Sequence, residues 1–183
     1  MNTKLTGDIA EQTAIVHALK HGWGVLKPIG DRLPYDLVFD VHGIVVKIQV
    51  KSAWFDAVRA NFVVDNRRTK TNRRQMVRSR YCETDFDFAL AYIATVDLFY
   101  VFPVVVFTDY ASEIHLVESD SRQRKARSVA YRDAWHLIAQ WAAYRETGTC
   151  LSVKLGEAHN GGNPEPSLEG NFEEGVETER RTP

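Results

Sequence analysis

Three polar residues near the open end of one predicted β-hairpin form the strongest candidate site in the chain. Two runs rich in Val and Ile, YDLVFDV and IVVKIQV, are separated by the dipeptide His-Gly at 42–43, and such a connection is typical of a hairpin. With this loop, Asp36 lies opposite Gln49, and Lys51 points to the same face two residues farther on. A carboxylate, an amide oxygen and an ammonium then converge on one patch, a combination suited to acid–base or ionic chemistry.

The same strand has a simpler interpretation. Lys47, Gln49 and Lys51 alternate along it, so they could all point into water from a solvated face. Polar side chains within a Val/Ile-rich strand cost free energy unless they are paired. A slip of the hairpin by one residue would move Asp36 to the opposite face. The residues alone leave both interpretations open.

A second unusual position is Glu11, within a helix predicted over 5–21. Its neighbours Ala14, Ile15 and Ala18 form an apolar stripe, and a carboxylate buried there needs a cation, hydrogen bonds or a raised pKa. The alternative is a Glu at the flank of the helix, in water. His17 and His21 on this helix are four residues apart and could bind a metal, but no acidic partner is evident, which favours a surface or core pair.

The remaining elements would have to position these residues. After the hairpin, the pattern predicts a strand at 62–65, an exposed arm or long loop at 66–80, two nearly continuous apolar strands (FALAYIA and LFYVFPVVVF) buried on both faces, a weak strand at HLVE, and a helix over 130–144. A short strand is predicted at 23–27. This order of helix, strands and helix predicts an α/β or α+β single domain.

Length and composition narrow the class of protein. The 183 residues correspond to one domain, and no apolar run approaches the length of a membrane helix. Cys82 and Cys150 are isolated, which excludes a disulfide scaffold and a Cys-based zinc site and predicts a reducing, cytoplasmic environment. We therefore expect an intracellular protein with no membrane partner.

The net charge of −1 hides an uneven distribution. Residues 156–183 contain seven Glu and two Arg and few large apolar residues, which predicts a disordered acidic tail. The preceding domain, 1–155, keeps 21 basic and 17 acidic residues, a net charge of +4. Two segments concentrate its cations: 59–80 has eight Arg or Lys and one acid, and 122–132 has five and none. This pattern favours a polyanionic partner.

Taken together, the ordered set Glu11, Asp36, Gln49 and Lys51 resembles the PD-(D/E)XK nuclease superfamily, and within it the group I intron-encoded homing endonucleases. The resemblance rests on GDIAEQ and PYDLVFDVHGIVVKIQVKSA and extends from about residue 3 to 103, including the arginine-rich arm and LFYVFPV. It implies a restriction-endonuclease-like domain with a mixed central sheet flanked by helices. Two positions depart from the pattern: PYD stands where the family has PD, and Gln49 replaces the second acid.

The resemblance implies a role for each residue. A hard divalent cation, Mg²⁺ or Mn²⁺, prefers oxygen ligands, and these would come from Asp36, Glu11, the Gln49 side chain and the Val50 backbone carbonyl. The cation would polarise the scissile phosphate and lower the pKa of a water. Lys51 would hold or deprotonate that water and stabilise the transition state, provided that its own pKa is lowered.

The arm would supply the contacts to DNA. Its cations are interleaved with Thr, Asn, Gln and Ser, and such residues contact phosphates and base edges; the candidates are Arg67, Arg68, Lys70, Arg73, Arg74, Arg78 and Arg80. The basic segment 122–132 is a weaker candidate for phosphate contacts. A solvated flexible loop is the alternative for the arm.

We therefore expect a Mg²⁺-dependent, site-specific endonuclease acting on double-stranded DNA, most similar to a group I intron homing endonuclease. Two strand cuts need two active sites, so a homo-oligomer is expected, a dimer or, by the resemblance, a tetramer. A restriction, repair or junction-resolving nuclease of the same fold is one alternative. A non-catalytic DNA-binding protein on a degenerate nuclease scaffold is the other.

Overall fold

The computed structural model describes residues 3–30, 32–71, 76–118 and 126–148, all within one compact unit. For residues 70, 71, 76 and 77 only the backbone is described. The tail predicted at 156–183 lies outside these ranges. The elements, in chain order, are α1 (Thr3–Lys20), β1 (Gly24–Leu26), β2 (Leu37–Val41), β3 (Ile44–Ser52), β4 (Trp54–Asp56), β5 (Asn61–Asp65), β6 (Arg67–Thr71), β7 (Met76–Arg80), β8 (Phe88–Ile93), β9 (Leu98–Pro103), α2 (Val104–Asp109), β10 (Glu113–Leu116), a 3₁₀ turn η1 (Arg127–Tyr131) and α3 (His136–Thr147).

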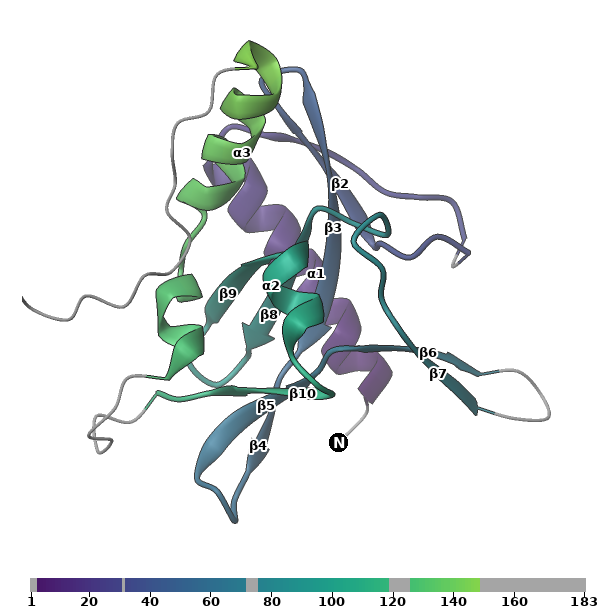
Figure 1. The fold of residues 1–183 in the computed structure, drawn as a ribbon, viewed down its shortest axis with the longest axis vertical. Helices are drawn as coiled ribbons and strands as arrows, with labels where there is room; N and C mark the ends of the chain where they lie inside the picture. Colours follow the sequence, from purple (N-terminus) through teal and green to yellow (C-terminus); the bar gives the residue numbers. More distant parts are fainter. Residues whose placement is uncertain (1–2, 31, 72–75, 119–125, 149–183) are drawn as a thin grey trace, which may run out of the picture. The chain divides into compact units, whose positions relative to one another are not determined.

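A five-stranded mixed sheet forms the centre of the domain, with the strand order β1-β2-β3-β8-β9 (Figure 1). Only β3 and β8 pair in parallel; the other neighbours in this sheet are antiparallel. A second sheet has the order β10-β5-β4, and β6 pairs with β7 in a separate two-stranded ribbon. The predicted fold class, a mixed central sheet with flanking helices, is confirmed.

The predicted hairpin is present with the predicted register. Val41 pairs with Ile44 and Leu37 with Ile48, so the loop is the dipeptide 42–43. Both loop residues have positive φ, 55° and 90°, as a type I′ turn requires. The loop is held further by a hydrogen bond of 2.7 Å from the Gly43 N–H to Asp40 Oδ1.

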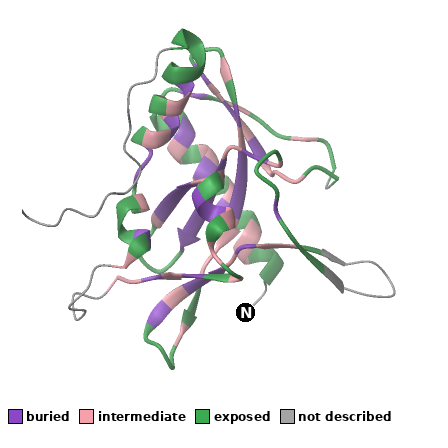
Figure 2. Cartoon of the chain, viewed as in Figure 1, coloured by how far each residue is buried: buried purple, intermediate pink, exposed green. Residues whose placement is uncertain are grey.

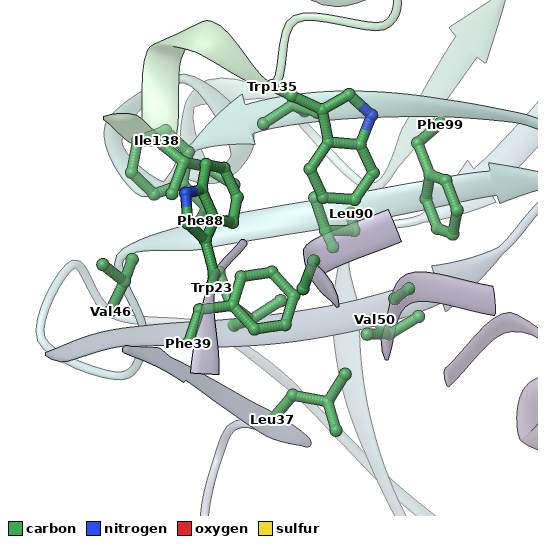
Figure 3. Packing of buried hydrophobic residues seen from close by; sticks show 14 of the residues in the cluster. Trp23, Leu37, Phe39, Val46, Val50, Phe88, Leu90, Phe99, Trp135 and Ile138 are labelled. Atoms are coloured by element: carbon green, nitrogen blue, oxygen red, sulfur yellow. The ribbon is translucent and has the colours of Figure 1, made fainter. Parts of the chain in front are cut away.

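Successive side chains of β8 and β9 point to opposite faces of the sheet and belong to two separate apolar clusters. Nearly all residues of both strands are buried (Figure 2). On one face, Phe88, Leu90 and Val101 pack with residues of α1 and α3 (Figure 3). On the other face, Ala89 and Phe102 pack with residues of α2, β5 and β10. The prediction that these strands are buried on both faces is confirmed.

Helix α1 lies against the first of these clusters through small side chains. Ala10, Ala14 and Ala18 are fully buried, and their lack of bulk lets the helix approach the sheet closely. The end of β3, next to the candidate site, is hydrogen-bonded to the first part of this helix: Ser52 Oγ donates to the Thr6 carbonyl oxygen at 3.0 Å. The helix therefore brings Glu11 to the edge of the sheet at the level of the site.

The segment predicted as an exposed arm or long loop forms two strands. Residues 67–71 and 76–80 pair in an antiparallel ribbon with Arg67 opposite Arg80. Its sequence is mostly polar and lacks the alternation of apolar and polar residues that a period-two pattern detects. Asn66 joins it to β5, and its Nδ2 donates to the carbonyl oxygens of Phe107 at 3.2 Å and Tyr110 at 2.7 Å.

Two further predictions were wrong in part. The second apolar strand stops at Pro103, and VVVF forms helix α2, because Pro103 cannot donate in a ladder but is suited to a helix start. The helix predicted over 130–144 begins only at His136, because Asp133 has a positive φ of 50° that interrupts helical geometry. Tyr131 consequently lies in η1 and is not on the buried face of α3, which contains Ile138 and Ala142.

Candidate functional site

Asp36 and Gln49 meet on one face of the β2–β3 hairpin. The register places them opposite each other, and the Asp36 N–H donates to the Ile48 carbonyl oxygen at 2.9 Å. Asp36 Oδ2 accepts hydrogen bonds from Gln49 Nε2 and from the Val50 N–H, the latter at 2.8 Å. Gln49 is only 7% exposed, so it does not belong to a solvated face. The alternative interpretation of the strand is wrong at this position.

The environment of Asp36 disfavours its charged form. Burial raises the pKa of Asp36 to about 6, and the negative charge of Glu11 acts in the same direction. The Val50 N–H and the charges of Lys51 and Lys27 oppose this rise in pKa. A carboxyl group with such a pKa is an efficient binding site for a cation, because a positive charge relieves the cost of ionising it.

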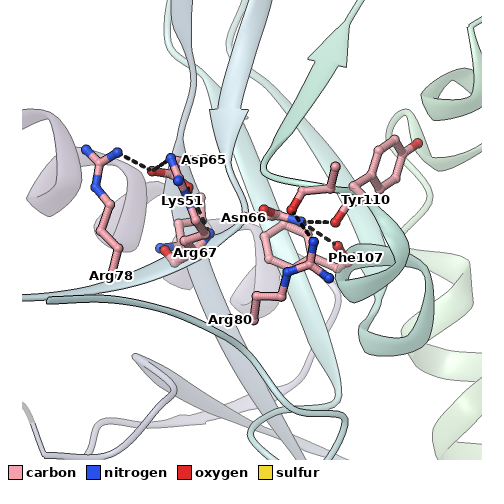
Figure 4. A network of polar contacts seen from close by, with 9 residues as sticks. Lys51, Asp65, Asn66, Arg67, Arg78, Arg80, Phe107 and Tyr110 are labelled. Carbon is pink, nitrogen blue, oxygen red and sulfur yellow. Dashed lines mark hydrogen bonds and ion pairs between the residues drawn. The ribbon is translucent and has the colours of Figure 1, made fainter.

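Lys51 lies on the same strand face, beside the arm. Its Nζ donates a 3.0 Å hydrogen bond to the Arg67 carbonyl oxygen (Figure 4). The same Nζ lies 5.1 Å from the centre of the Tyr81 ring. Burial lowers the pKa of Lys51, while Asp36 and Asp65 act to raise it. The lowered pKa is the condition that the sequence analysis set for a lysine that accepts a proton.

Glu11 reaches this region from α1 and is paired with a lysine that the sequence analysis missed. Its Oε2 lies 2.7 Å from Lys27 Nζ, and its charge acts on Asp36. Lys27 directly follows β1, whose last pair, Leu26 with Val38, lies two residues from Asp36. No spacing motif marks Lys27; it stands simply at the end of a short strand before a proline.

The donor set fits a hard divalent cation. Gln49 Nε2 donates to Asp36 Oδ2 and also, at 3.1 Å, to the Val50 carbonyl oxygen. The two oxygens therefore lie around one point, and carboxylate and carbonyl oxygens are ligands of hard divalent cations. Over the described residues, no group of three or more His, Cys, Asp or Glu side chains could hold a metal. A cation here would therefore depend on the amide and carbonyl oxygens as well as on the two carboxylates.

Two of the described arginines of the arm pair with one acid, and two donate to main-chain oxygens elsewhere. Asp65 Oδ1 accepts from Arg67 Nε at 3.0 Å, and Asp65 Oδ2 lies 3.8 Å from Arg78 (Figure 4). Arg68 donates to the carbonyl oxygens of residues 32 and 33, and Arg80 to that of Ala111 at 3.0 Å. Arg73 and Arg74 lie outside the described residues, as does the side chain of Lys70.

The weaker candidates are used in structural contacts. His17 stacks on Trp135 and His21 on Trp23, with ring centres 5.2 Å and 4.8 Å apart. His17 is half-buried and His21 is exposed, so both make aromatic contacts at the border of the first apolar cluster. In the second basic segment, Arg127 pairs with Asp109 at 2.6 Å. Arg132 in the same segment pairs with Glu118 at 3.1 Å.

Comparison with known proteins gives a consistent result. A family model described as PD-(D/E)XK endonuclease matches residues 1–138. Among solved structures, the chain is similar to a bacterial homing endonuclease, I-Ssp6803I, with 65% sequence identity and a TM-score of 0.75 over 80% of this chain and 99% of that one. No curated protein sequence matches the chain. None of the helices in the described ranges is long and apolar enough to cross a membrane.

Proposed function

The chain belongs to the PD-(D/E)XK endonuclease family, and from this premise we propose that it cuts double-stranded DNA at a specific site with Mg²⁺, as a group I intron homing endonuclease. The observation that carries the proposal is the shared face of Asp36, Gln49 and Lys51, with Glu11 beside it. The resemblance to the homing endonuclease supports the biological context. Two isolated cysteines suit action inside the cell, where the DNA is.

Each side chain of the site has a distinct task in this proposal. Asp36, Glu11, the Gln49 amide and the Val50 carbonyl hold the cation, which is Mg²⁺ or, as a substitute, Mn²⁺. When bound, the cation supplies positive charge that polarises the scissile phosphate. The pKa of Asp36 supports this assignment: burial and the charge of Glu11 raise it, and a cation bound at this carboxyl would favour its charged form.

Lys51 acts on the attacking water. Its Nζ is held by the Arg67 carbonyl oxygen and the Tyr81 ring, which restricts the four-carbon side chain to one direction. In its neutral form, favoured by burial, the amine accepts the proton of the water as the oxygen attacks phosphorus. In its charged form, it stabilises the negative charge that develops on the phosphate.

The arm binds the duplex beside this face. Arg67 and Arg80 lie directly opposite each other across the ribbon, and Arg78 and Arg80 are exposed on β7. Exposed guanidinium groups of this kind can donate to the phosphate oxygens of DNA. We therefore assign DNA contacts to the arm as predicted from the sequence, with Arg67, Arg68, Arg78 and Arg80 as its described members.

An oligomer supplies the second active site that a double-strand cut needs. Ile9, Val16 and Leu19 are 46%, 48% and 59% exposed on α1, and with Gln12 they follow the 3–4 spacing of a helix-pairing seam. A second copy of α1 can cover this stripe with the same side chains. Sedimentation should show a dimer or tetramer, and Val16→Glu with Leu19→Glu should shift it toward the monomer.

One experiment tests the cutting activity. Plasmids that carry candidate target sequences are incubated with the wild-type protein and Mg²⁺, alongside Asp36→Ala and Lys51→Ala. Cleavage by the wild-type protein alone supports the proposal. Binding without cleavage, on targets that include the intron-free host sequence, would favour the DNA-binding alternative. Cleavage dependent on branched or damaged DNA would favour a repair or junction-resolving role.

The proposal places catalysis in residues 1–155 and treats 156–183 as an accessory tail. A chain ending at residue 155 should then keep its melting temperature and its cleavage activity. A large fall in melting temperature would contradict this division.

A further inference from the structure

Lys27 is an unassigned charged group at the candidate site. Its Nζ lies 2.7 Å from Glu11 Oε2, and its charge acts on Asp36 and on Asp8 as well. Lys51 approaches Asp36 from β3, whereas Lys27 approaches from the end of β1. Two lysines thus flank the two carboxylates of the site.

The exposure of this ion pair differs between its partners. The Glu11 side chain is 24% exposed and that of Lys27 is 55% exposed. An exposed ion pair is weak, commonly about 0.2–1 kcal/mol, and the lysine can leave it by rotating its flexible stem. Glu11 is held on α1, which packs on the sheet through fully buried alanines, so Lys27 is the mobile partner.

A divalent cation and Lys27 compete for the same oxygen. Glu11 Oε2 is engaged by the ammonium at hydrogen-bonding distance, and a cation at the site would both need that oxygen and repel the lysine. The displaced ammonium would remain beside the carboxylates of Glu11 and Asp36, where the proposed function places the cation and the scissile phosphate. An ammonium is a common partner for phosphate oxygens.

We propose that Lys27 is a second functional lysine, which occupies Glu11 in the metal-free enzyme and transfers to a DNA phosphate when the cation binds. The inference rests on the proposed function, because it assumes that Glu11 is a metal ligand. It explains how a site with two carboxylates remains stable before metal arrives. It also couples the two binding events, because the metal that takes Glu11 Oε2 releases Lys27 to bind a DNA phosphate.

The test compares Lys27→Met and Lys27→Arg with the wild-type protein, with Lys20→Met on the exposed end of α1 as the matched control. Calorimetric titration with Ca²⁺ alone, without DNA, measures the competition. Lys27→Met should bind Ca²⁺ about two- to fivefold more tightly, the range that loss of an exposed ion pair allows. Lys27→Arg and Lys20→Met should stay within about twofold of the wild-type value.

A second measurement follows the DNA contact. Binding of a 30-base-pair duplex of random sequence is measured with Ca²⁺ present over a range of salt, and Lys27→Met should lower the slope of log K against log[salt] by about 1. Lys27→Arg should restore the slope. Unchanged or weaker Ca²⁺ binding by Lys27→Met, or an unchanged slope, would overturn the inference. Plasmid cleavage by the wild-type protein is scored separately, so that a failure of the proposed function is distinguishable from a failure at Lys27.

Discussion

The ammonium of Lys51 donates a hydrogen bond to the main-chain carbonyl oxygen of Arg67, 3.0 Å away, at the first residue of the arm. A main-chain oxygen moves only when the chain moves, so the direction of Lys51 depends on where β6 begins. Asp65 fixes that start, because its Oδ1 accepts from the Arg67 N–H at 2.9 Å. The arm and the lysine are therefore mechanically connected.

Asp65→Asn should loosen the start of the arm and with it the position of Lys51. The substitution keeps a side-chain oxygen for the Arg67 N–H but removes the charge that attracts Arg67 and Arg78. Because small misplacements of a reacting group are costly, we expect the cleavage rate to fall about tenfold with a change in melting temperature of only a few degrees. Single-turnover cleavage and thermal unfolding measure the two effects.

Asp56→Asn is the matched control, since it breaks a comparable ion pair with Arg59 away from the arm. It should leave the cleavage rate unchanged. Equal losses in both variants would mean that Asp65 acts only on folding.

Removal of arm cations should change the salt dependence of DNA binding. Arg78 and Arg80 are exposed on β7, and each phosphate contact contributes nearly one unit to the slope of log K against log[salt]. Arg78→Ala with Arg80→Ala should reduce the slope by about 2. Arg145→Ala, on α3 against Trp141, should not alter it. A slope that stays constant in the double variant would exclude these two arginines as phosphate contacts.

Asp36 should make the metal-free protein less stable as pH rises. Its pKa is about 6 in the folded chain and 3.8 when the group is free in water, so between these values the folded state holds a proton that the unfolded state has lost. The free energy of unfolding then falls by about 2 kcal/mol from this group between pH 4 and pH 7. The Asp36→Asn variant has no titrating group at this position. Urea denaturation in EDTA should therefore show that the free energy of unfolding of the variant, relative to that of the wild-type protein, increases from pH 4 to pH 7. A constant difference would contradict the raised pKa.

Ala14→Leu should destabilise the domain. Ala14 is fully buried in the stripe by which α1 approaches the sheet, and added methylenes in a packed core cost about 1–3 kcal/mol. Chemical denaturation should show this loss of free energy of unfolding. Lys20→Leu adds the same side chain at an exposed position of α1 and should stay within about 0.5 kcal/mol; similar effects in both variants would mean that close packing at Ala14 is not the cause.

The hairpin that holds Asp36 and Gln49 was predictable because its signals are local. A Gly-containing loop sets the register, and the register decides which side chains share a face. The neighbours of the site were not predictable in this way. Lys27 meets Glu11 across 16 positions of sequence, and Lys51 meets a main-chain oxygen of Arg67 across another 16, and neither contact leaves a periodic pattern.

The least accurate predictions have a common physical origin. The arm is mostly polar and helix α2 consists mainly of β-branched residues, so the local composition does not indicate strands in the first case or a helix in the second. Tertiary contacts decide instead. Val106 and Phe107 are buried against the second apolar cluster. Asn66 anchors the start of the ribbon by donating to the carbonyl oxygens of Phe107 in α2 and of Tyr110 after it.

Over the residues that the structure describes, β6 and β7 contribute nothing to either apolar cluster. Substitutions in the ribbon beyond its first residue pair, Arg67 with Arg80, therefore do not disturb the packing of the described core. If the ribbon contacts DNA as proposed, its substitutions would alter the preferred target sequence without disturbing the core that positions Asp36, Gln49 and Lys51.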